Sequence, residues 1–97
     1  IDRNGIQNDR WTHQVMNLAP LPQKWNAFGW HTIEIDGHDL SQIIDALNEA
    51  KGITGQPTVI VAKTIKGKGV SFMENNPNFH GKAPSIEQAE LALKEIG

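Results

Sequence analysis

Lysine and glycine alternate in a short segment that follows the most apolar run of the chain. This segment, KTIKGKG (residues 63–69), comes directly after TVIVA, and a lone histidine, His80, lies further on and is followed by Gly81. Glycine lets the backbone approach an anion and turn N–H groups toward it, while lysine adds a mobile positive charge. These residue types therefore indicate a loop that meets a phosphate group.

A solvated lysine loop that only closes a strand is the simpler alternative, because most runs of charge are merely hydrated. The segment is also not a P-loop: the spacing before Gly67 and Lys68 is wrong, and no Ser or Thr directly follows the lysine. On composition alone, both interpretations stay open.

The elements before this loop predict a βαβ unit. HTIEID (residues 31–36) alternates apolar and polar residues as a strand does, and TVIVAKTI (58–65) is typical of a strand buried on both faces. Between them, Asp39 and Gln42 form a predicted capping box for a helix that ends near Gly52. Its apolar face would consist of Leu40, Ile43, Ile44 and Leu47.

Both strands of such a unit run in the same direction, with a right-handed crossover. The turn DGHD (36–39) and the segment 63–69 then leave the sheet at one edge, where α/β sheets bind ligands. If Ile1 and Asp2 end another parallel strand, RNGIQ (3–7) emerges there too. Three loops are therefore expected to converge on a binding site.

The remaining segments predict shorter elements. Residues 7–20 are expected to be mostly loop with one helical turn, and residues 21–29 a short helix with Pro22 in its first turn and Gly29 at its end. A last helix should begin after Pro84 with a capping box of Ser85 and Gln88. The aromatic residues Trp25, Phe28 and Trp30 are expected in the core, and the inner face of the last helix would be Ile86, Ala89, Leu93 and Ile96.

Composition sets broad limits. The 97 residues make one domain at most, and 38% hydrophobic residues, 21% charged residues and a net charge of −2 argue against a nucleic-acid-binding or membrane-surface protein. The chain has no cysteine, so a reducing cytoplasmic location is the expectation. It starts IDRNG, without Met, which suggests a piece of a longer protein.

Three stretches in order, KWNAFGWHTIEIDGHD, PTVIVAKTIKGKGVSFMENN and FHGKAP, resemble the diphosphate-binding domain of transketolases, the thiamine diphosphate enzymes of sugar-phosphate metabolism. The resemblance runs from about Ile1 to Pro84, and AKTIKGKG with HGKAP is its most specific part. The likeness is closer to the short, separately encoded amino-terminal half of split transketolases.

The resemblance implies a magnesium site that bridges protein and cofactor diphosphate. In the family the ligands are an Asp in a Gly-Asp-Gly motif, an Asn about thirty residues later and a main-chain carbonyl two residues beyond the Asn. Asn4 and the carbonyl of Ile6 match the last two, which suit Mg²⁺ as a hard ion. The Gly-Asp-Gly motif does not occur in this chain. The alternative for Asn4 is a turn residue before Gly5.

Further site residues follow from the same resemblance. Lys66 matches the lysine near the diphosphate, with Lys63 and Lys68 as weaker candidates. His80 matches the histidine that faces the thiazolium carbon and the reacting end of the sugar, and Gly81 would let the chain turn past the cofactor. The alternative for His80 is a loop residue packed beside Phe79.

The implied fold is α/β, a three-layer thiamine-diphosphate-binding fold, with residues 1–97 a partial domain that lacks its N-terminal side and keeps a parallel βαβ core. The implied function is ketol transfer between sugar phosphates, as in the pentose phosphate pathway, with thiamine diphosphate and Mg. Complementary transketolase domains or a C-terminal subunit would be partners, in a dimer, and this piece alone would be inactive.

Two alternative functions stay open. One is a non-catalytic remnant that keeps only the fold. The other is a related thiamine diphosphate enzyme, such as a sugar-phosphate synthase or a 2-oxo acid dehydrogenase component.

Overall fold

A computed structural model describes residues 1–97, which form two compact units. The first unit contains Ile1–Arg3 and Leu18–Thr64, and the second contains Asn4–Asn17 and Ile65–Gly97. None of the helices has the length and apolar character needed to cross a bilayer.

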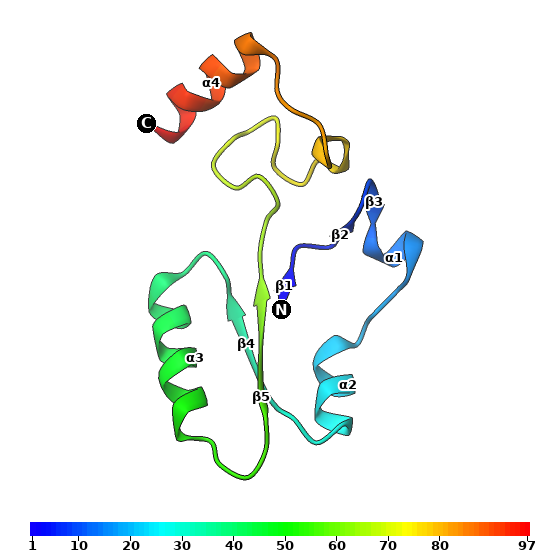
Figure 1. The fold of residues 1–97 in the computed structure, drawn as a ribbon, viewed down its shortest axis with the longest axis vertical. Helices are drawn as coiled ribbons and strands as arrows, with labels where there is room; N and C mark the ends of the chain where they lie inside the picture. Colours follow the sequence, from blue (N-terminus) through cyan, green and yellow to red (C-terminus); the bar gives the residue numbers. More distant parts are fainter. The chain divides into compact units, whose positions relative to one another are not determined.

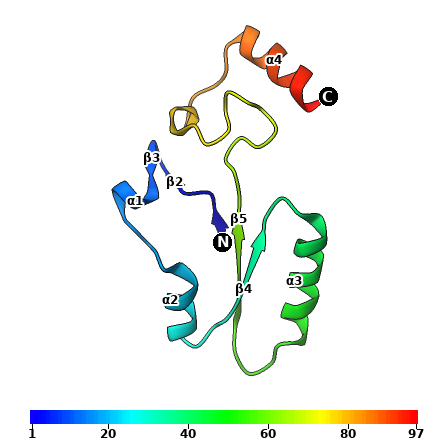
Figure 2. The ribbon, with the colours of Figure 1, turned by 180° about the vertical axis from the view of Figure 1, so that it is seen from behind.

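The first unit is built on a three-stranded parallel sheet in the order β1-β5-β4. Its strands are β1 (Asp2–Arg3), β4 (His31–Asp36) and β5 (Thr58–Lys63). The helix α3 (Leu40–Gly52) joins β4 to β5, and α2 (Leu21–Ala27) precedes β4; the two helices lie on opposite sides of the β4–β5 pair (Figures 1 and 2). The predicted βαβ unit and the additional parallel strand at the start of the chain are therefore confirmed.

The central strand β5 supplies two of the buried core residues. Val59 and Val61 are 6% and 2% exposed, and Ala46 of α3 is 3% exposed. Val59 and Val61 share one face of β5, whereas the opposite face is only half-buried and lines an open hollow. The predicted burial of this strand on both faces therefore holds for one face only. The residues from His31 to Asp36 pair with those from Thr58 to Lys63 in register, so both strands end at the same edge.

The start of α3 shows how a polar turn ends one element and begins the next. The Asp39 carboxylate accepts hydrogen bonds from the backbone N–H groups of Ser41 and Gln42, at 2.9 and 3.2 Å. The Gln42 side chain accepts from the N–H of Asp36 at 2.8 Å, so only half of the predicted capping box forms. Gln42 thereby ties the end of β4 to the first turn of α3.

Two predicted apolar faces are not buried. In α3, Leu40, Ile44 and Leu47 are 74%, 58% and 51% exposed, and the helix packs through Ala46 instead. Phe28 is also exposed, which contradicts its predicted place in the core, whereas Trp25 and Trp30 pack edge to face with ring centroids 4.8 Å apart. Helical spacing identified these faces correctly as apolar, but nothing in the chain covers them.

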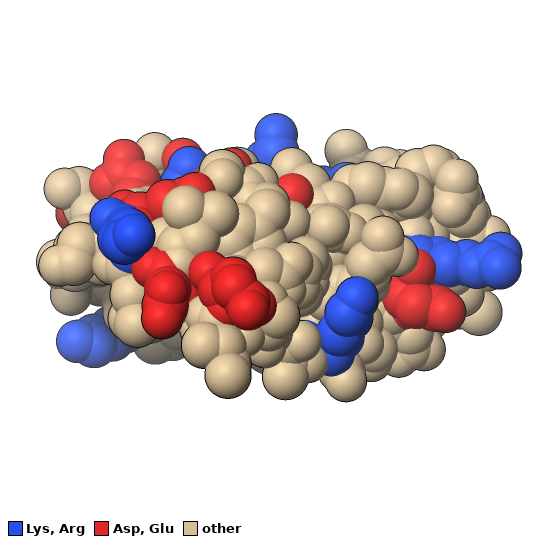
Figure 3. Space-filling model, turned by 90° about the horizontal axis from the view of Figure 1, so that it is seen from above, with Lys and Arg blue, Asp and Glu red and all other residues tan.

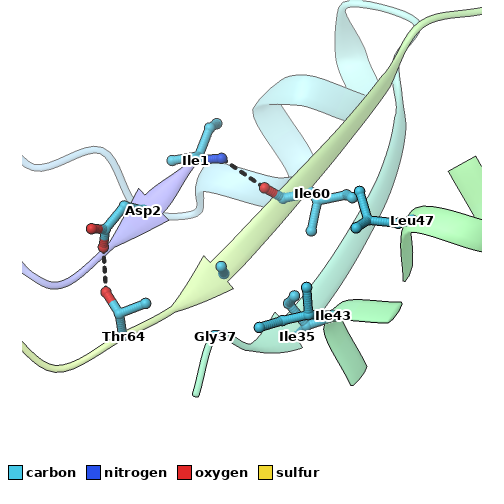
Figure 4. Close-up of a pocket in the computed structure, with 9 residues that line it drawn as sticks. Ile1, Asp2, Ile35, Gly37, Ile43, Leu47, Ile60 and Thr64 are labelled. Carbon is cyan, nitrogen blue, oxygen red and sulfur yellow. Dashed lines mark hydrogen bonds between the residues drawn. The ribbon is translucent and has the colours of Figure 1, made fainter. Parts of the chain in front are cut away.

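An open apolar hollow of about 350 Å³ lies on the sheet beside α3 (Figure 4). Four isoleucines contribute to its lining: Ile1, which directly precedes β1, Ile35 of β4, Ile60 of β5 and Ile43 of α3. At one end, the Thr64 hydroxyl donates a hydrogen bond to the Asp2 carboxylate. The hollow carries no cationic side chain, so it has none of the chemistry expected of a phosphate site.

The second unit consists of short elements and one longer helix. Near the start of the chain, β2 (Ile6–Gln7) and β3 (Arg10–Trp11) pair as antiparallel strands, followed by the single turn α1 (Thr12–Val15). The helical turn was predicted, but the two short strands were not. After the lysine segment come a 3-10 turn, η1 (Pro77–Phe79), and α4 (Ile86–Ile96).

Both halves of the predicted capping box at the start of α4 form. The Ser85 hydroxyl accepts from the N–H of Gln88 at 3.2 Å, and the Gln88 side chain accepts from the N–H of Ser85 at 3.0 Å. The predicted inner face is wrong, however: Ile86, Leu93 and Ile96 are 78%, 66% and 62% exposed. The capping residues Ser85 and Gln88 correctly predicted where the helix starts. The face that the helix buries depends on which surfaces it meets, and the capping residues carry no information about that.

Candidate functional site

The lysine segment is a closed and highly hydrogen-bonded loop. The Lys66 carbonyl accepts from the N–H of Asn75 at 3.0 Å, which closes a ring of residues 66–75. Inside the ring, the Gly67 carbonyl accepts from the N–H of Val70, and the Val70 side chain is only 8% exposed. We call residues 65–76 the lysine loop. Its backbone is fixed by its own hydrogen bonds, which is unlike a freely solvated charge run.

Glycine is required at one position of this loop. Gly67 has a φ of +74°, and a Cβ there would lie 2.7 Å from both the Cβ and the carbonyl oxygen of Met73. Only glycine fits such a left-handed conformation with backbone this close. The glycine that the sequence placed next to the lysines therefore serves the folding of the loop.

The three lysines differ in their surroundings. Lys66 is half-buried and its ammonium forms no ion pair, whereas Lys68 lies 3.9 Å from the Glu74 carboxylate. Lys63 is exposed at the last position of β5. Of the three, Lys66 combines a fixed backbone with an uncompensated charge, which is the arrangement that an anion site needs.

Asn4 forms the turn that the alternative interpretation predicted. Its side-chain oxygen accepts from the N–H of Ile6 at 2.9 Å, Gly5 has a φ of +76°, and the Gly5 carbonyl accepts from the N–H of Thr12. An amide oxygen has a second lone pair, so this turn leaves one acceptor position on Asn4. The turn therefore holds the side chain in place and remains compatible with a metal-ligand role.

His80 follows η1 at the surface. Phe79 packs against Phe72 of the lysine loop with ring centroids 5.7 Å apart, and the Asn76 side chain caps η1 by accepting from the N–H of Asn78. The His80 side chain is exposed and forms no hydrogen bond within the chain. Phe79 thus packs on the loop rather than under His80, whose imidazole is available to a ligand.

Gly81 adopts a left-handed φ of +67°, and no atom lies within 4 Å of the position of a Cβ. The conformation agrees with the predicted tight turn after His80. The open space shows that the turn, rather than close packing within the chain, is what glycine provides here.

The second unit therefore contains every residue predicted for the cofactor and the metal: Asn4, Ile6, Lys66, His80 and Gly81. The turn DGHD belongs to the first unit, where the N–H of Gly37 donates to the Lys63 carbonyl at 2.8 Å. The predicted convergence of this turn with the other two loops stays a prediction.

On the face drawn in Figure 3, charged side chains are dispersed. Figure 3 shows basic and acidic side chains as small separate groups among uncharged residues on the face drawn. A continuous basic surface would be expected of a nucleic-acid-binding protein. The lysine loop is thus a local feature, as the net charge of −2 predicts.

The donors present fit one side of a diphosphate and part of a magnesium site. Lys66 offers a charge, and the Asn4 amide and Ile6 carbonyl offer the hard oxygen atoms that Mg²⁺ prefers. No group of three His, Cys, Asp or Glu side chains comes together anywhere in the chain. Magnesium sites usually include one or two carboxylates, so the set is incomplete on its own.

Comparison with known proteins decides the family. The model of the transketolase thiamine diphosphate-binding domain matches residues 1–97. The chain belongs to this family. A 6-deoxy-6-sulfo-D-fructose transketolase subunit of a Clostridium species is 41% identical over 95 residues, covering 98% of this chain and 34% of that protein.

Other relatives support the assignment to the transketolase family. An apulose-4-phosphate transketolase subunit of Actinobacillus succinogenes is 38% identical over 98% of this chain and 34% of its own length. The crystal structure of Campylobacter jejuni transketolase has the same fold, with a TM-score of 0.70 at 23% identity, over 98% of this chain and 19% of that one. This transketolase-family chain thus spans about a third of the subunits that it matches, and its partial α/β fold with a parallel sheet is confirmed.

Sequence reasoning missed several residues that shape the site. Asn75 closes the lysine loop, and Glu95 of α4 binds Ser71 within it. The first contact spans nine positions, from Lys66 to Asn75, and the second spans 24. No local pattern of residue types could have indicated them.

Proposed function

We propose that this chain is part of a transketolase that transfers a two-carbon ketol unit between sugar phosphates with thiamine diphosphate and Mg²⁺. The observation that carries the proposal is the closed lysine loop at the end of β5, in a chain matched along its whole length by a thiamine diphosphate-binding domain. The chain would supply one side of the diphosphate and magnesium site.

Each residue has a specific part in this proposal. The Lys66 ammonium neutralises diphosphate charge, Gly81 lets the backbone pass closely, and Asn4 and the Ile6 carbonyl contribute oxygen ligands to Mg²⁺. Bound thiamine diphosphate supplies the carbanion chemistry, and the protein binds and orients it. The His80 imidazole donates a hydrogen bond to the sugar carbonyl oxygen as that oxygen gains negative charge.

Partners follow from the incomplete donor set. The relatives named as subunits are about three times as long as this chain, since it covers 34% of each. We infer that complementary transketolase segments supply the missing carboxylate and the rest of the cofactor site, in a dimeric cytoplasmic enzyme. The names of the relatives suggest a ketose, phosphorylated or otherwise acidic, as the donor.

Reconstitution tests the proposal. The full protein with its complementary subunit, supplied with thiamine diphosphate and Mg²⁺, should convert a ketose phosphate and an aldose phosphate into products that differ by two carbons. Mass spectrometry of the sugar products is the measurement. Cofactor binding without any two-carbon transfer would favour a related thiamine diphosphate enzyme, and absence of binding would favour a non-catalytic remnant.

A further inference from the structure

The last turn of α4 contacts the lysine loop through the side chain of Glu95. The Glu95 carboxylate accepts two hydrogen bonds from Ser71, from its backbone N–H at 2.5 Å and from its hydroxyl at 2.7 Å. A Cβ on Gly69, whose φ is +95°, would lie 3.5 Å from the Cγ2 atom of Ile96. The end of the helix is therefore joined to the loop by a bidentate polar contact, and an added methyl group on Gly69 would just touch Ile96.

A glutamate is an unfavourable residue at this position of a helix. Glu95 lies next to the C-terminal residue of α4, where the helix dipole presents partial negative charge and favours a cation such as Lys94. The backbone N–H of Ser71 and then its hydroxyl hold the pKa of Glu95 below its ordinary value. The two hydrogen bonds from Ser71 offset the unfavourable interaction between the carboxylate and the helix dipole. The reason for a glutamate at this position is therefore its contact with the loop, and not the stability of the helix itself.

Ser71 belongs to the ring that fixes the backbone of Lys66. It directly follows the buried Val70, within the segment that the hydrogen bond between Lys66 and Asn75 closes. Within the ring, the N–H of Gly69 also donates to the Glu74 carboxylate at 3.0 Å. The side chain of Glu95, which lies outside the loop, forms hydrogen bonds with the ring. It accepts from both the backbone N–H and the hydroxyl of Ser71.

We propose that Glu95, through Ser71, is a positioning residue that anchors the lysine loop and so holds Lys66 ready for an anionic ligand. The role toward a ligand rests on the proposed function. The anchoring itself concerns only this chain and can be measured without any cofactor.

Amide hydrogen exchange of the ligand-free full protein tests the anchoring. Glu95→Ala should make the amides of Ser71 and Asn75 exchange at least about fivefold faster, because the variant loses both hydrogen bonds that join α4 to the loop. Exchange within β5 should not change. The matched control is Glu90→Ala, since Glu90 is exposed on the same helix and forms no hydrogen bond to the loop.

Should Glu95→Ala unfold α4, Ser71→Ala provides a milder test, because it removes only the hydroxyl hydrogen bond. Faster exchange at Asn75 in that variant supports the proposal. Exchange rates equal to those of the wild type in the loop, in either variant that keeps its fold, overturn it.

A second measurement separates positioning from simple support of the fold. Titration calorimetry measures the affinity for thiamine diphosphate with Mg²⁺. The effect of Glu95→Ala is determined once in the protein that keeps Lys66 and once in the Lys66→Ala variant. Positioning through Lys66 predicts an affinity loss of at least about twofold in the first and little loss in the second, since coupled residues are non-additive. Equal losses in both backgrounds overturn the proposal. Failure of the wild-type protein to bind contradicts the proposed function instead, and the exchange experiment still decides the anchoring.

Discussion

At the scale of single residues, Lys66 and His80 have proposed roles that substitutions can separate. Lys66 has its backbone fixed in the closed loop and its ammonium without an ion pair. His80 is exposed beyond η1, with an imidazole that forms no hydrogen bond in the chain. The first is placed to bind an anion, and the second can act on a reacting group only when a ligand is present.

Replacing Lys66 by Ala in the complete enzyme should weaken binding of thiamine diphosphate by about 1–3 kcal/mol, the value of one charge-assisted hydrogen bond. Titration calorimetry measures the effect, and Lys51→Ala, at an exposed lysine of α3, is the control. Unchanged affinity in the Lys66 variant would remove this residue from the site.

His80→Ala should lower the turnover number while leaving the affinity for the cofactor nearly intact. A hydrogen bond that forms as charge develops on the sugar carbonyl stabilises the transition state more than the ground state. Steady-state kinetics at saturating cofactor measure it, with the exposed His13→Ala as control. Normal turnover with a normal Michaelis constant would make His80 an ordinary surface residue.

At the scale of elements, sequence patterns predicted where helices and strands begin and end better than how they pack. Asp39 and Ser85 marked the starts of α3 and α4, because a cap is a local contact between near neighbours. The buried face of α3 was not predictable, because burial depends on which surfaces a helix meets. In the site, Lys66 was visible as a residue type beside glycine, whereas the bond from Asn75 that fixes it is a tertiary contact.

The cap of α3 should make stability depend on pH. Hydrogen bonds from the backbone and side chain of Gln42 and from the N–H of Ser41 lower the pKa of Asp39. A lowered pKa means that the ionised carboxylate stabilises the fold fully above the ordinary pKa of aspartate, and that this contribution is lost as pH falls through the lower folded value. Asp39→Ala should therefore reduce the free energy of unfolding at pH 7, with a smaller difference from wild type in strong acid. Denaturant unfolding followed by circular dichroism at both pH values tests this, and a difference that does not shrink in acid would contradict it.

Gly67→Ala should destabilise the second unit by roughly 1–3 kcal/mol, because alanine tolerates the left-handed φ poorly and its methyl would collide with Met73. Gly52→Ala is the control: Gly52 is the last residue of α3, has no positive φ and has no atom within 4 Å of a Cβ. In thermal unfolding, the melting temperature of Gly67→Ala should be well below that of the Gly52→Ala control. Equal melting temperatures would mean that the loop backbone is not as constrained as its hydrogen bonds indicate.

At the scale of the whole molecule, the apolar surface exceeds what the chain can cover. Leu40, Ile44 and Leu47 of α3 are more than half exposed, and an open apolar hollow lies beside them on the sheet. The edge strands β1 and β4 each leave one side without a strand partner. Surfaces of this kind normally meet another polypeptide.

The 97-residue chain by itself should therefore associate with a partner or with its own copies, and should neither bind thiamine diphosphate tightly nor catalyse ketol transfer. The proposed metal site offers an amide and a carbonyl oxygen but no carboxylate. Light scattering and calorimetry on the isolated chain measure both expectations. Cofactor binding at micromolar concentration, or turnover of a sugar phosphate, would show that these residues form a complete site.

The pairing of β1 with β5 has a consequence for synthesis on the ribosome. The amino group of Ile1 donates to the Ile60 carbonyl across a separation of 59 residues, and the Arg3 carbonyl accepts from the N–H of Thr64. At an elongation rate of about 5–20 residues per second, roughly 3–12 s pass between the synthesis of β1 and the synthesis of β5. During this time Asp2 and Arg3 lack the partner that β5 provides. Until β5 has been made, the backbone groups of these residues that will pair with it stay open to strands of other chains.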